Sequence, residues 1–390
     1  MNPARINASL LVLACLLLVS ARVSYGETAD AVKGTIHVHP GESIQAALDR
    51  AAENPDTAHV IVHAGTYRPP APRQALIWFN QRHDGITLEA QGQVVLTAAN
   101  PDVADKAAPS FPAIVNHVVY FGDHIGPRTT LRGFKITGAN NFVTMDQGPK
   151  IQPQIDEPKL KKTLFFYRDG GGIKIFGRSY PTIDNVEIYD NYSSPCGAGI
   201  SIEHRGFMDQ AVTIRNSIFR DNRVPLTGAA IDLLDHELGS AAVIENCLFV
   251  DNLANCPKQD AVSRWLETWK PRAGHGAITV FWFSRAVVRK CTFVGNRNGV
   301  DDGSRDSTYS DCIFWQNTAP GGWSVGKRYE MDILNGPGVE GCFLGGDLAD
   351  ARGRIDADKN VLDAPDPEFD ESYRPRQPLY RDTGYRPITP

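Results

Sequence analysis

A sevenfold internal repeat constrains this 390-residue chain more than any other feature of its sequence. The repeat is a short run of β-branched and aromatic residues interrupted by Asn, Gly or Asp, as in residues 182–188 and 243–249. The remaining copies begin at Thr130, Thr213, Val287, Thr308 and Gly338. Residues of the first kind favour strands, whereas Asn, Gly and Asp favour turns. A unit this short cannot bury its apolar face alone, so the copies must stack, and the sequence predicts a parallel β-solenoid.

Alternation along each strand indicates which side chains point into the solenoid. One predicted inward ladder contains Phe134, Val186, Ser217, Cys247, Cys291, Cys312 and Cys342. A second contains Ile136, Ile188, Phe219, Phe249, Phe293, Phe314 and Leu344. Between the two ladders, Asn185, Asn216 and Asn246 are expected to stack in a turn whose left-handed backbone Asn tolerates. We interpret these asparagines as structural.

Small residues open a second strand before most copies. These strands are expected in the runs 170–175, 197–202, 228–233 and 274–280. Small residues let the chain turn tightly into a strand, and a coil of such a solenoid takes about 20–30 residues. We therefore predict an all-β domain over residues 27–347 with about ten to twelve coils. An amphipathic helix at 43–52 is suited to cap it, and residues 348–390 are expected to form an extended tail packed on or trailing from the coils.

The N-terminus predicts export. Residues 1–26 have the pattern of a secretory signal peptide, with Arg5 before an apolar core at 10–19 that is shorter than the about 20 residues of a membrane span. We expect a secreted protein, periplasmic or extracellular, with no membrane span. The formal net charge of −5 argues against a nucleic-acid partner, and we expect a monomer.

Seven cysteines are divided by this organisation into three groups. Cys15 leaves with the signal peptide. The four cysteines of the first inward ladder are expected to be reduced thiols that act as small hydrophobic residues. Cys196 and Cys256 lie in turns after the repeat, and the longer loop around Cys256 could fold back, so we predict a disulfide between them.

Three segments resemble the secreted right-handed parallel β-helix proteins of the pectin/pectate lyase-like superfamily. They are residues 38–49 with 60–67, the Asn-Cys-x-Phe-x-x-Asn repeat, and residues 366–370 with 373–375 and 382–384. The resemblance spans nearly the whole mature chain and implies a right-handed β-helix whose small-residue strand floors a carbohydrate groove. It leaves the activity open, because the superfamily contains lyases, hydrolases, epimerases and non-catalytic members.

Polar side chains alternate with the inward residues of these strands. The outward set is Lys174, Ser201, Asp232, Thr279, Asp301 and Asp332. Directly after the strands come Arg178, Glu203, His204, Arg205, Asp235, His236, Glu237 and Trp282. Acids, bases and an aromatic on one face suit a sugar-binding cleft, although any solvated sheet face also carries polar residues.

A polysaccharide is therefore the expected partner, and a lyase that cleaves uronate-containing polymer by β-elimination is the first hypothesis. That reaction needs a base near the C5 proton and positive charge at the carboxylate. We assign catalytic roles to Lys174, Asp232, Asp301, His236 and Arg205. Substrate contacts are expected from Glu203, His204, Arg178, Thr279, Trp282, Trp265 and Trp269. The alternatives are a glycoside hydrolase with paired Asp residues, or a non-catalytic glycan-binding or cell-envelope β-helix protein.

The spacing of the acids leaves the mechanism open. Coils lie about 4.8 Å apart, so Asp301 and Asp332 would be about 5 Å apart and Asp232 about 10 Å from Asp301, which excludes neither a retaining nor an inverting hydrolase. No cofactor is required, but Asp301 and Asp332 could bind Ca²⁺.

Two further patterns have more than one interpretation. Residues 274–276 and 301–302 resemble the Gly-His-Gly and Asp-Asp of polygalacturonases, but in reversed order along the chain. We interpret Gly274 and Gly276 as members of the small-residue run that opens a strand. Trp265 and Trp269, four apart, either stack on sugar or pack a helix onto the solenoid.

Overall fold

The computed structural model divides by its contacts into Met1–Val32 and Lys33–Pro390, and the second unit is described below. The described residues are 34–54, 56–102, 113–140, 160, 164–235, 238–254, 275–317, 329–333, 336, 338–345, 351–353 and 355–388. The predicted signal peptide at 1–26 lies outside them. None of the helices in the described part of the chain is long and apolar enough to cross a membrane.

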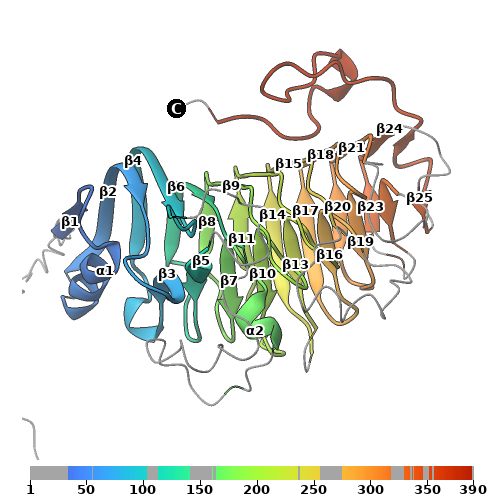
Figure 1. The fold of residues 1–390 in the computed structure, drawn as a ribbon. Coiled ribbons are helices and arrows are strands. Elements are labelled where there is room, and N and C mark those ends of the chain that lie inside the picture. The colour runs from blue at the N-terminus through green and yellow to red at the C-terminus, as the bar shows by residue number, and fades with distance from the viewer. Residues whose placement is uncertain are drawn as a thin grey trace, which may run out of the picture. The chain divides into compact units, whose positions relative to one another are not determined.

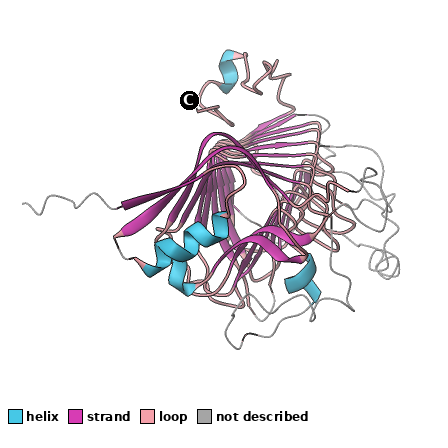
Figure 2. Cartoon of the chain, turned by 60° about the vertical axis from the view of Figure 1, so that its left-hand side comes forward, coloured by secondary structure: helices cyan, strands magenta, loops and turns pink. Residues whose placement is uncertain are grey.

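Two parallel sheets form the unit and wind around a common core (Figures 1 and 2). Sheet A has 17 strands: β1 (Gly34–Val38), β2 (Thr57–Tyr67), β4 (Thr87–Thr97), β6 (Thr130–Thr137), β8 (Thr182–Asp184), β9 (Glu187–Tyr189), β11 (Val212–Arg215), β12 (Ile218–Arg220), β14 (Ala241–Glu245), β15 (Leu248–Val250), β17 (Arg285–Arg289), β18 (Thr292–Val294), β20 (Thr308–Ser310), β21 (Ile313–Trp315), β23 (Gly338–Glu340), β24 (Phe343–Gly345) and β26 (Val361–Leu362).

Sheet B supplies no more than one strand to each coil in the described part of the chain. Its nine strands are β3 (Arg73–Phe79), β5 (Val115–Phe121), β7 (Ile173–Phe176), β10 (Ile200–Glu203), β13 (Ile231–Leu233), β16 (Ile278–Val280), β19 (Val300–Asp302), β22 (Met331–Asp332) and β25 (Ala351–Arg352). Six pairs of strands and five single strands give sheet A eleven steps, within the predicted ten to twelve coils. The predicted all-β solenoid is confirmed.

Each paired step of sheet A bends at the predicted turn. Asn185, Asn216 and Asn246 have φ values of 52°, 54° and 51°, the left-handed conformation that Asn tolerates better than most residues. Asn246 Nδ2 donates to Asn216 Oδ1 at 2.9 Å, as expected, whereas Asn216 Nδ2 donates to Asp184 Oδ1 at 2.9 Å and not to Asn185. In the long strand β6, Gly133 takes the same position with φ of 82°.

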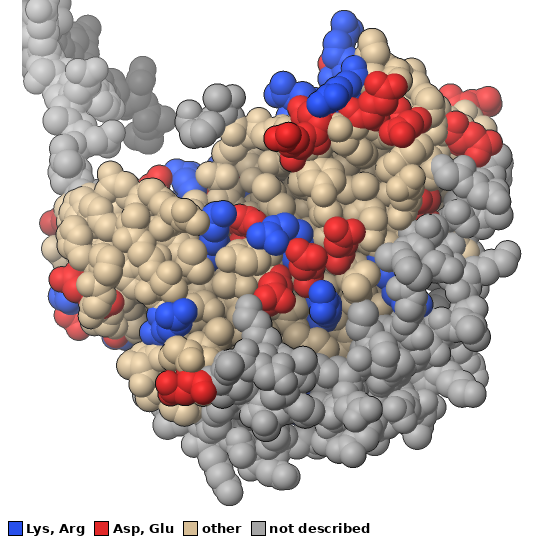
Figure 3. All heavy atoms as spheres, turned by 45° about the horizontal axis from the view of Figure 1, so that its top comes forward, with Lys and Arg blue, Asp and Glu red and all other residues tan. Residues whose placement is uncertain are grey.

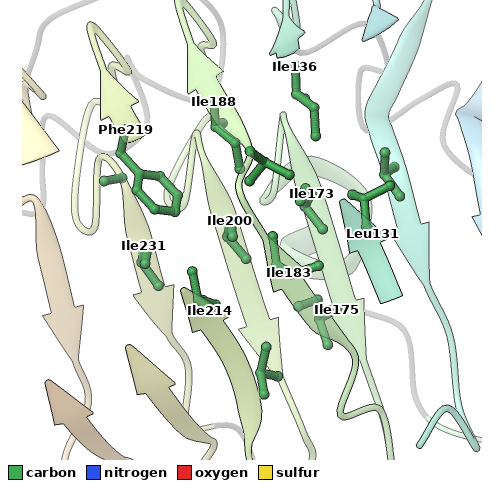
Figure 4. Packing of buried hydrophobic residues seen from close by; sticks show 14 of the residues in the cluster. Leu131, Ile136, Ile173, Ile175, Ile183, Ile188, Ile200, Ile214, Phe219 and Ile231 are labelled. Carbon is green, nitrogen blue, oxygen red and sulfur yellow. The ribbon is translucent and has the colours of Figure 1, made fainter. Parts of the chain in front are cut away.

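The predicted inward ladders form the core between the two sheets (Figure 4). Phe219, Phe249, Phe293 and Phe314 stack face to face, with successive ring centroids 5.0, 4.5 and 4.6 Å apart. Burying one such ring contributes about 1.5–3 kcal/mol. The four ladder cysteines are buried free thiols, which confirms their predicted role as small core residues.

A second asparagine ladder, which closes the repeat, was not predicted as a structural device. Each carboxamide Nδ2 donates to the Oδ1 of the next rung over 2.7–3.1 Å. The rungs are Asn191, Asn222, Asn252, Asn296 and Asn317. Glu330 ends the ladder by accepting from Asn317 Nδ2 at 2.6 Å. These amides lie inside the fold and must satisfy one another there.

The predicted N-terminal helix is α1 (Ile44–Glu53), and Ser43 caps it by accepting from the Ala46 N–H. Its buried face, Ile44, Ala47, Leu48 and Ala51, joins the main core. The other helices are α2 (Leu164–Arg168) and the 3₁₀ turns η1 (Gln81–His83) and η4 (Pro378–Tyr380).

The C-terminal segment first continues the coils and then folds back over them. β25 pairs with β22 and β26 pairs with β24, so both sheets extend past residue 347. Farther on, the Tyr385 N–H donates to Thr292 Oγ1 at 2.9 Å, and the Arg386 N–H donates to Asn246 Oδ1 at 2.7 Å. The segment therefore returns along the outside of sheet A, at the top of Figure 1.

Candidate functional site on the outer face of sheet B

The outward polar row follows sheet B in register. Its side chains, in order along the solenoid, are Tyr120, Lys174, Ser201, Asp232, Thr279, Asp301 and Asp332. Alternation placed six of these residues correctly on neighbouring strands of one face, because the inward residues between them are locked into the core.

The expected solvent exposure of this row is wrong. Lys174, Ser201 and Asp232 are fully buried, and Thr279, Asp332 and Asp301 are at most 9% exposed. Part of the cover is α2, because Lys174 Nζ donates to the Phe165 carbonyl at 3.3 Å. Alternation distinguishes the inside of a coil from its outside, but it does not reveal what packs on the outside. The substrate and catalytic roles assigned to this row stay predictions.

Lys174, Glu203 and Arg205 form a buried triad. Lys174 Nζ lies 2.8 Å from Glu203 Oε2, and Arg205 Nη2 lies 2.8 Å from Glu203 Oε1, with all three side chains at most 3% exposed. Lys174 also donates to Ser201 Oγ at 3.1 Å. With the Phe165 carbonyl, these contacts engage all three N–H donors of the ammonium group.

His204, predicted to bind substrate, is a fully buried residue whose two ring nitrogens have protein partners. Nε2 lies 2.9 Å from the Ser179 carbonyl, and Nδ1 accepts from the Ala241 N–H at 3.2 Å. Burial lowers the pKa of this ring to about 4. His275 differs in one respect: Nδ1 contacts the Leu226 carbonyl at 2.9 Å and burial lowers the pKa to about 4, but Nε2 has no hydrogen-bond partner in the described part of the chain. The contacts of His204 hold its ring within the fold, and its predicted contact with substrate stays a prediction.

Asp169, which sequence reasoning missed, joins Cys196 and Asp232 in a fully buried cluster. One possible ligand atom from each residue lies within 4.8 Å of the others. Burial raises the pKa of Asp169 to about 8 and the pKa of Asp232 well above its ordinary value. Asp169 stands directly before the small-residue run, as Cys196 does one coil later, and this shared position is the signal that could have identified it.

The adjacent acids Asp301 and Asp302 point to opposite sides of β19. Asp301 belongs to the outward row, whereas Asp302 accepts from Tyr309 Oη at 2.7 Å, where the ring of Tyr309 is part of the core. The two carboxylates therefore do not form a pair on one face. Asp301 and Asp332 are register partners, and their predicted Ca²⁺ binding stays a prediction.

Beyond the ends of the sheet B strands lies an exposed strip that we call the aromatic edge: Phe207, Leu238, Trp282 and Phe283. Trp282 is 71% exposed, Phe283 62% and Leu238 59%. Gly303 in the following coil leaves room for the indole, since a Cβ there would lie 2.5 Å from Trp282 Cδ1. Of the aromatic residues predicted to contact substrate, Trp282 is the one that the structure describes at the surface.

Arg178, another predicted substrate contact, lies beside this edge. Its guanidinium carbon is 4.9 Å from the centroid of the Phe207 ring, a cation–π distance. Asp123 holds the guanidinium through contacts of 2.6 and 3.1 Å. Burial acts to raise the pKa of Asp123, but the hydrogen bonds from Arg178 outweigh it and hold the pKa below its ordinary value.

Several predicted residues lie outside the described part of the chain: His236, Trp265, Trp269 and Cys256. Their roles stay predictions. Cys196 is a buried free thiol that accepts a contact from Thr227 Oγ1 at 3.1 Å, and its predicted disulfide with Cys256 also stays a prediction.

The outer face of sheet A carries exposed charges that pair with one another. Lys135, Glu187 and Arg220 form an exposed triad across three strands, with N–O distances of 2.8 and 2.7 Å. Figure 3, turned toward the top of the molecule, shows basic and acidic residues interspersed. Paired charges of this kind do not make a patch for a polyanion.

Comparison with known proteins agrees with this architecture. Residues 128–264 match the family model described as "Right handed beta helix region". Together with the two parallel sheets, this match shows that the fold is a right-handed parallel β-helix, as predicted.

One solved structure similar to the chain is the A-module of the mannuronan C-5 epimerase AlgE4 from Azotobacter vinelandii. The match has 14% sequence identity and a TM-score of 0.33, and it covers 82% of this chain and 90% of that one. No curated protein matches the chain.

Proposed function

We propose that this protein is a carbohydrate-active β-helix protein that binds a polysaccharide along the aromatic edge. The observation that carries the proposal is the exposure of Trp282 and Phe283, 71% and 62%. Contiguous apolar side chains of this size in water usually mark a binding surface. Aromatic rings offer a flat apolar face that suits the C–H face of a sugar ring.

The direction of the edge favours a polymer over a small ligand. Leu238 and Trp282 follow β13 and β16, which are neighbours in sheet B, and the backbones of Gly239 and Phe283 lie against each other. The edge therefore crosses coils along the solenoid axis, where each step is about 4.8 Å. A linear chain of sugars could contact several coils at once.

Binding is tested with affinity electrophoresis and calorimetry on a panel of neutral and uronate-containing polysaccharides. For the polysaccharide that binds, Trp282→Ala should weaken affinity about tenfold, which is about 1.4 kcal/mol. Leu379→Ala is the matched control, because Leu379 is 51% exposed but lies in the C-terminal segment. Absence of binding to every polymer, or equal binding by wild type and Trp282→Ala, would overturn the proposal.

A second candidate function is β-elimination on a uronate polymer, and one observation favours it. Lys174 of the buried triad interacts electrostatically with Asp232, whose pKa is raised mainly by burial. A cation that neutralises a uronate carboxylate and a carboxyl group with a raised pKa are groups this reaction uses. We place it second because Lys174 and Asp232 are fully buried, whereas Trp282 and Phe283 are exposed.

The same polymers separate the two functions. A lyase leaves an unsaturated uronate, which absorbs in the ultraviolet, and the assay is run with and without Ca²⁺. Product formation by the wild type that is lost in Asp232→Asn would support the second candidate. Binding without unsaturated product, and without new reducing ends, would reject lyase and hydrolase activity and leave a glycan-binding protein.

A further inference from the structure

Three successive coils bring reactive side chains to one corner of sheet B. Asp169, Cys196 and Thr227 each stand directly before a glycine with positive φ, namely Gly170, Gly197 and Gly228 at 81°, 60° and 62°. The Gly170 N–H donates to the Gly197 carbonyl at 2.9 Å, and the Gly197 N–H donates to the Thr227 carbonyl at 3.2 Å. The three preceding residues therefore occupy the same place in consecutive coils.

Asp232 reaches this corner from the outward face of β13. Thr227 Oγ1 lies 3.3 Å from Asp232 Oδ1 and 3.1 Å from Cys196 Sγ. Because a hydroxyl has one proton, it can donate to only one of them at a time. The Cys196 N–H donates to Asp169 Oδ1 at 3.0 Å, which links the fourth side chain to the cluster.

Two carboxylate oxygens of the cluster have no hydrogen-bond partner among the described residues. Asp169 Oδ2 and Asp232 Oδ2 are buried and accept no hydrogen bond in the part of the chain that the structure describes. Lys174 cannot serve them, because its three donors are engaged by Phe165, Ser201 and Glu203. Buried oxygens of this kind are costly unless a proton or a cation satisfies them.

We propose that Asp169, Cys196 and Asp232 bind a zinc ion. The three possible ligand atoms lie within 4.8 Å of one another. Tetrahedral zinc with bonds of about 2.3 Å to sulfur and 2.0 Å to oxygen separates its ligands by about 3.3–3.5 Å, so small side-chain rotations close the site. Three protein ligands leave the fourth position for water.

The ligand types select among metals. A thiolate is a soft ligand that suits zinc and other late transition metals, whereas Ca²⁺ and Mg²⁺ prefer six or more oxygens. This site is distinct from the Asp301 and Asp332 pair, which offers oxygen alone. The competing explanation is a metal-free cluster in which protons satisfy both carboxyl groups, and the experiment distinguishes the two.

The test is calorimetric titration of chelator-treated, full-length mature protein with Zn²⁺, and separately with Ca²⁺ and Mg²⁺. We expect one Zn²⁺ per chain, a higher melting temperature on binding, and little response to the other two ions. Cys196→Ser and Asp232→Asn should each weaken Zn²⁺ binding at least about 100-fold. Cys342→Ser is the matched control, because this buried thiol of the inner ladder should not affect binding.

Cobalt provides a readout that reports the ligand itself. Co²⁺ bound by a thiolate gives a near-ultraviolet charge-transfer band, which should be present in wild type and absent in Cys196→Ser. If Cys196→Ser does not fold, the isosteric Asp232→Asn still tests affinity. The proposal is overturned if wild type does not bind Zn²⁺, or if both variants bind it as wild type does. It is also overturned if Ca²⁺ binds as tightly.

Discussion

The two sheets carry the same ionic arrangement in opposite surroundings. The exposed triad on sheet A and the buried triad on sheet B each place two cations against one glutamate at 2.7–2.8 Å. Side chains of the exposed triad are 19–39% exposed, whereas those of the buried triad are 0–3% exposed. Equal distances therefore do not imply equal energies, because solvent screens the first triad and is absent from the second.

This difference in burial indicates which of the two sheets is the better candidate for a functional site. Exposed pairs across strands keep sheet A polar at little cost. Buried charges are expensive, and a chain that retains several of them beside carboxylates with raised pKa has the signature of a functional site. Sheet B, and not the more highly charged surface of sheet A, is therefore the place to look for chemistry.

The largest effect is expected from neutralising the glutamate at the centre of each triad. Glu203→Gln removes the carboxylate charge that both buried cations, Lys174 and Arg205, contact, which should lower the free energy of unfolding by about 3–5 kcal/mol. Glu187→Gln, the matched change in the exposed triad, should lower it by less than about 1 kcal/mol. Urea denaturation of both variants measures the two values.

Equal losses in the two variants would contradict this comparison. Small losses in both would mean that water reaches the buried triad, and that sheet B is more open than its buried side chains indicate. Conversely, a large loss in Glu187→Gln would show that the exposed triad is structural. The slope of unfolding against urea must stay unchanged for the values to be comparable.

A second test uses the buried His204 beside sheet B. Its folded pKa of about 4 lies below the ordinary value of 6.5, so folding favours the neutral ring. The stability due to this residue is complete above about pH 6.5 and is lost as the pH falls toward 4, by about 1.4 kcal/mol per unit. The difference in unfolding free energy between wild type and His204→Gln should therefore shrink by about 2–3 kcal/mol between pH 6.5 and 4.5.

Comparing the two proteins at each pH removes the contribution of all other groups. Burial is the main cause of the low pKa, while the Ser179 carbonyl and Asp209 act to raise it. A difference that stays constant with pH would show that His204 is solvated in the folded protein. In that case its predicted contact with substrate would become the better explanation of its position.

Much of the fold was predictable because the repeat couples local pattern to global packing. The phenylalanine and cysteine ladders follow from alternation once the copies are aligned, and Asn216 and Asn246 follow from turn chemistry. The asparagine of the buried ladder that contains Asn252 recurs visibly in the sequence, but which hydrogen bonds it makes depends on the exact stacking of the coils. The sequence therefore predicted which residues recur, and the structure was needed to show which of them bond to one another.

The site was harder to predict for a physical reason. The position of Lys174 and Asp232 on one outward row follows from strand period, but their burial depends on what covers the strand from elsewhere in the chain. Asp169 shares with Cys196 the position directly before a small-residue run, but the two residue types differ, so the repeat did not mark this position. Trp282 was singled out because it comes directly after the strand that contains Thr279. Local pattern thus placed side chains correctly and gave no information about their solvent exposure.

The asparagines extend the comparison between buried and exposed polar groups. Asn252→Ala removes the oxygen that accepts from Asn222 Nδ2 and from the Asn222 backbone N–H, while Nδ2 keeps its bond to the Ile188 carbonyl. Opening the ladder in this way should cost about 1–3 kcal/mol. Asn216→Gly, in the turn of sheet A, keeps the left-handed backbone available and should cost less than about 1 kcal/mol. Thermal unfolding of the two variants measures the difference. Equal costs would show that the turn, and not the buried ladder, holds the coils together.

The smallest effect on stability is expected at the aromatic edge. A small effect there would distinguish a binding residue from a structural one. Trp282 is 71% exposed, so Trp282→Ala should change the free energy of unfolding by no more than about 0.5 kcal/mol. A substitution that weakens binding without lowering the free energy of unfolding identifies a residue that contacts the ligand and is not needed for folding. Stability unchanged together with glycan affinity reduced about tenfold would separate this edge from every structural residue above. A loss of stability above 1 kcal/mol would instead show that the indole, packed over Gly303, is part of the fold.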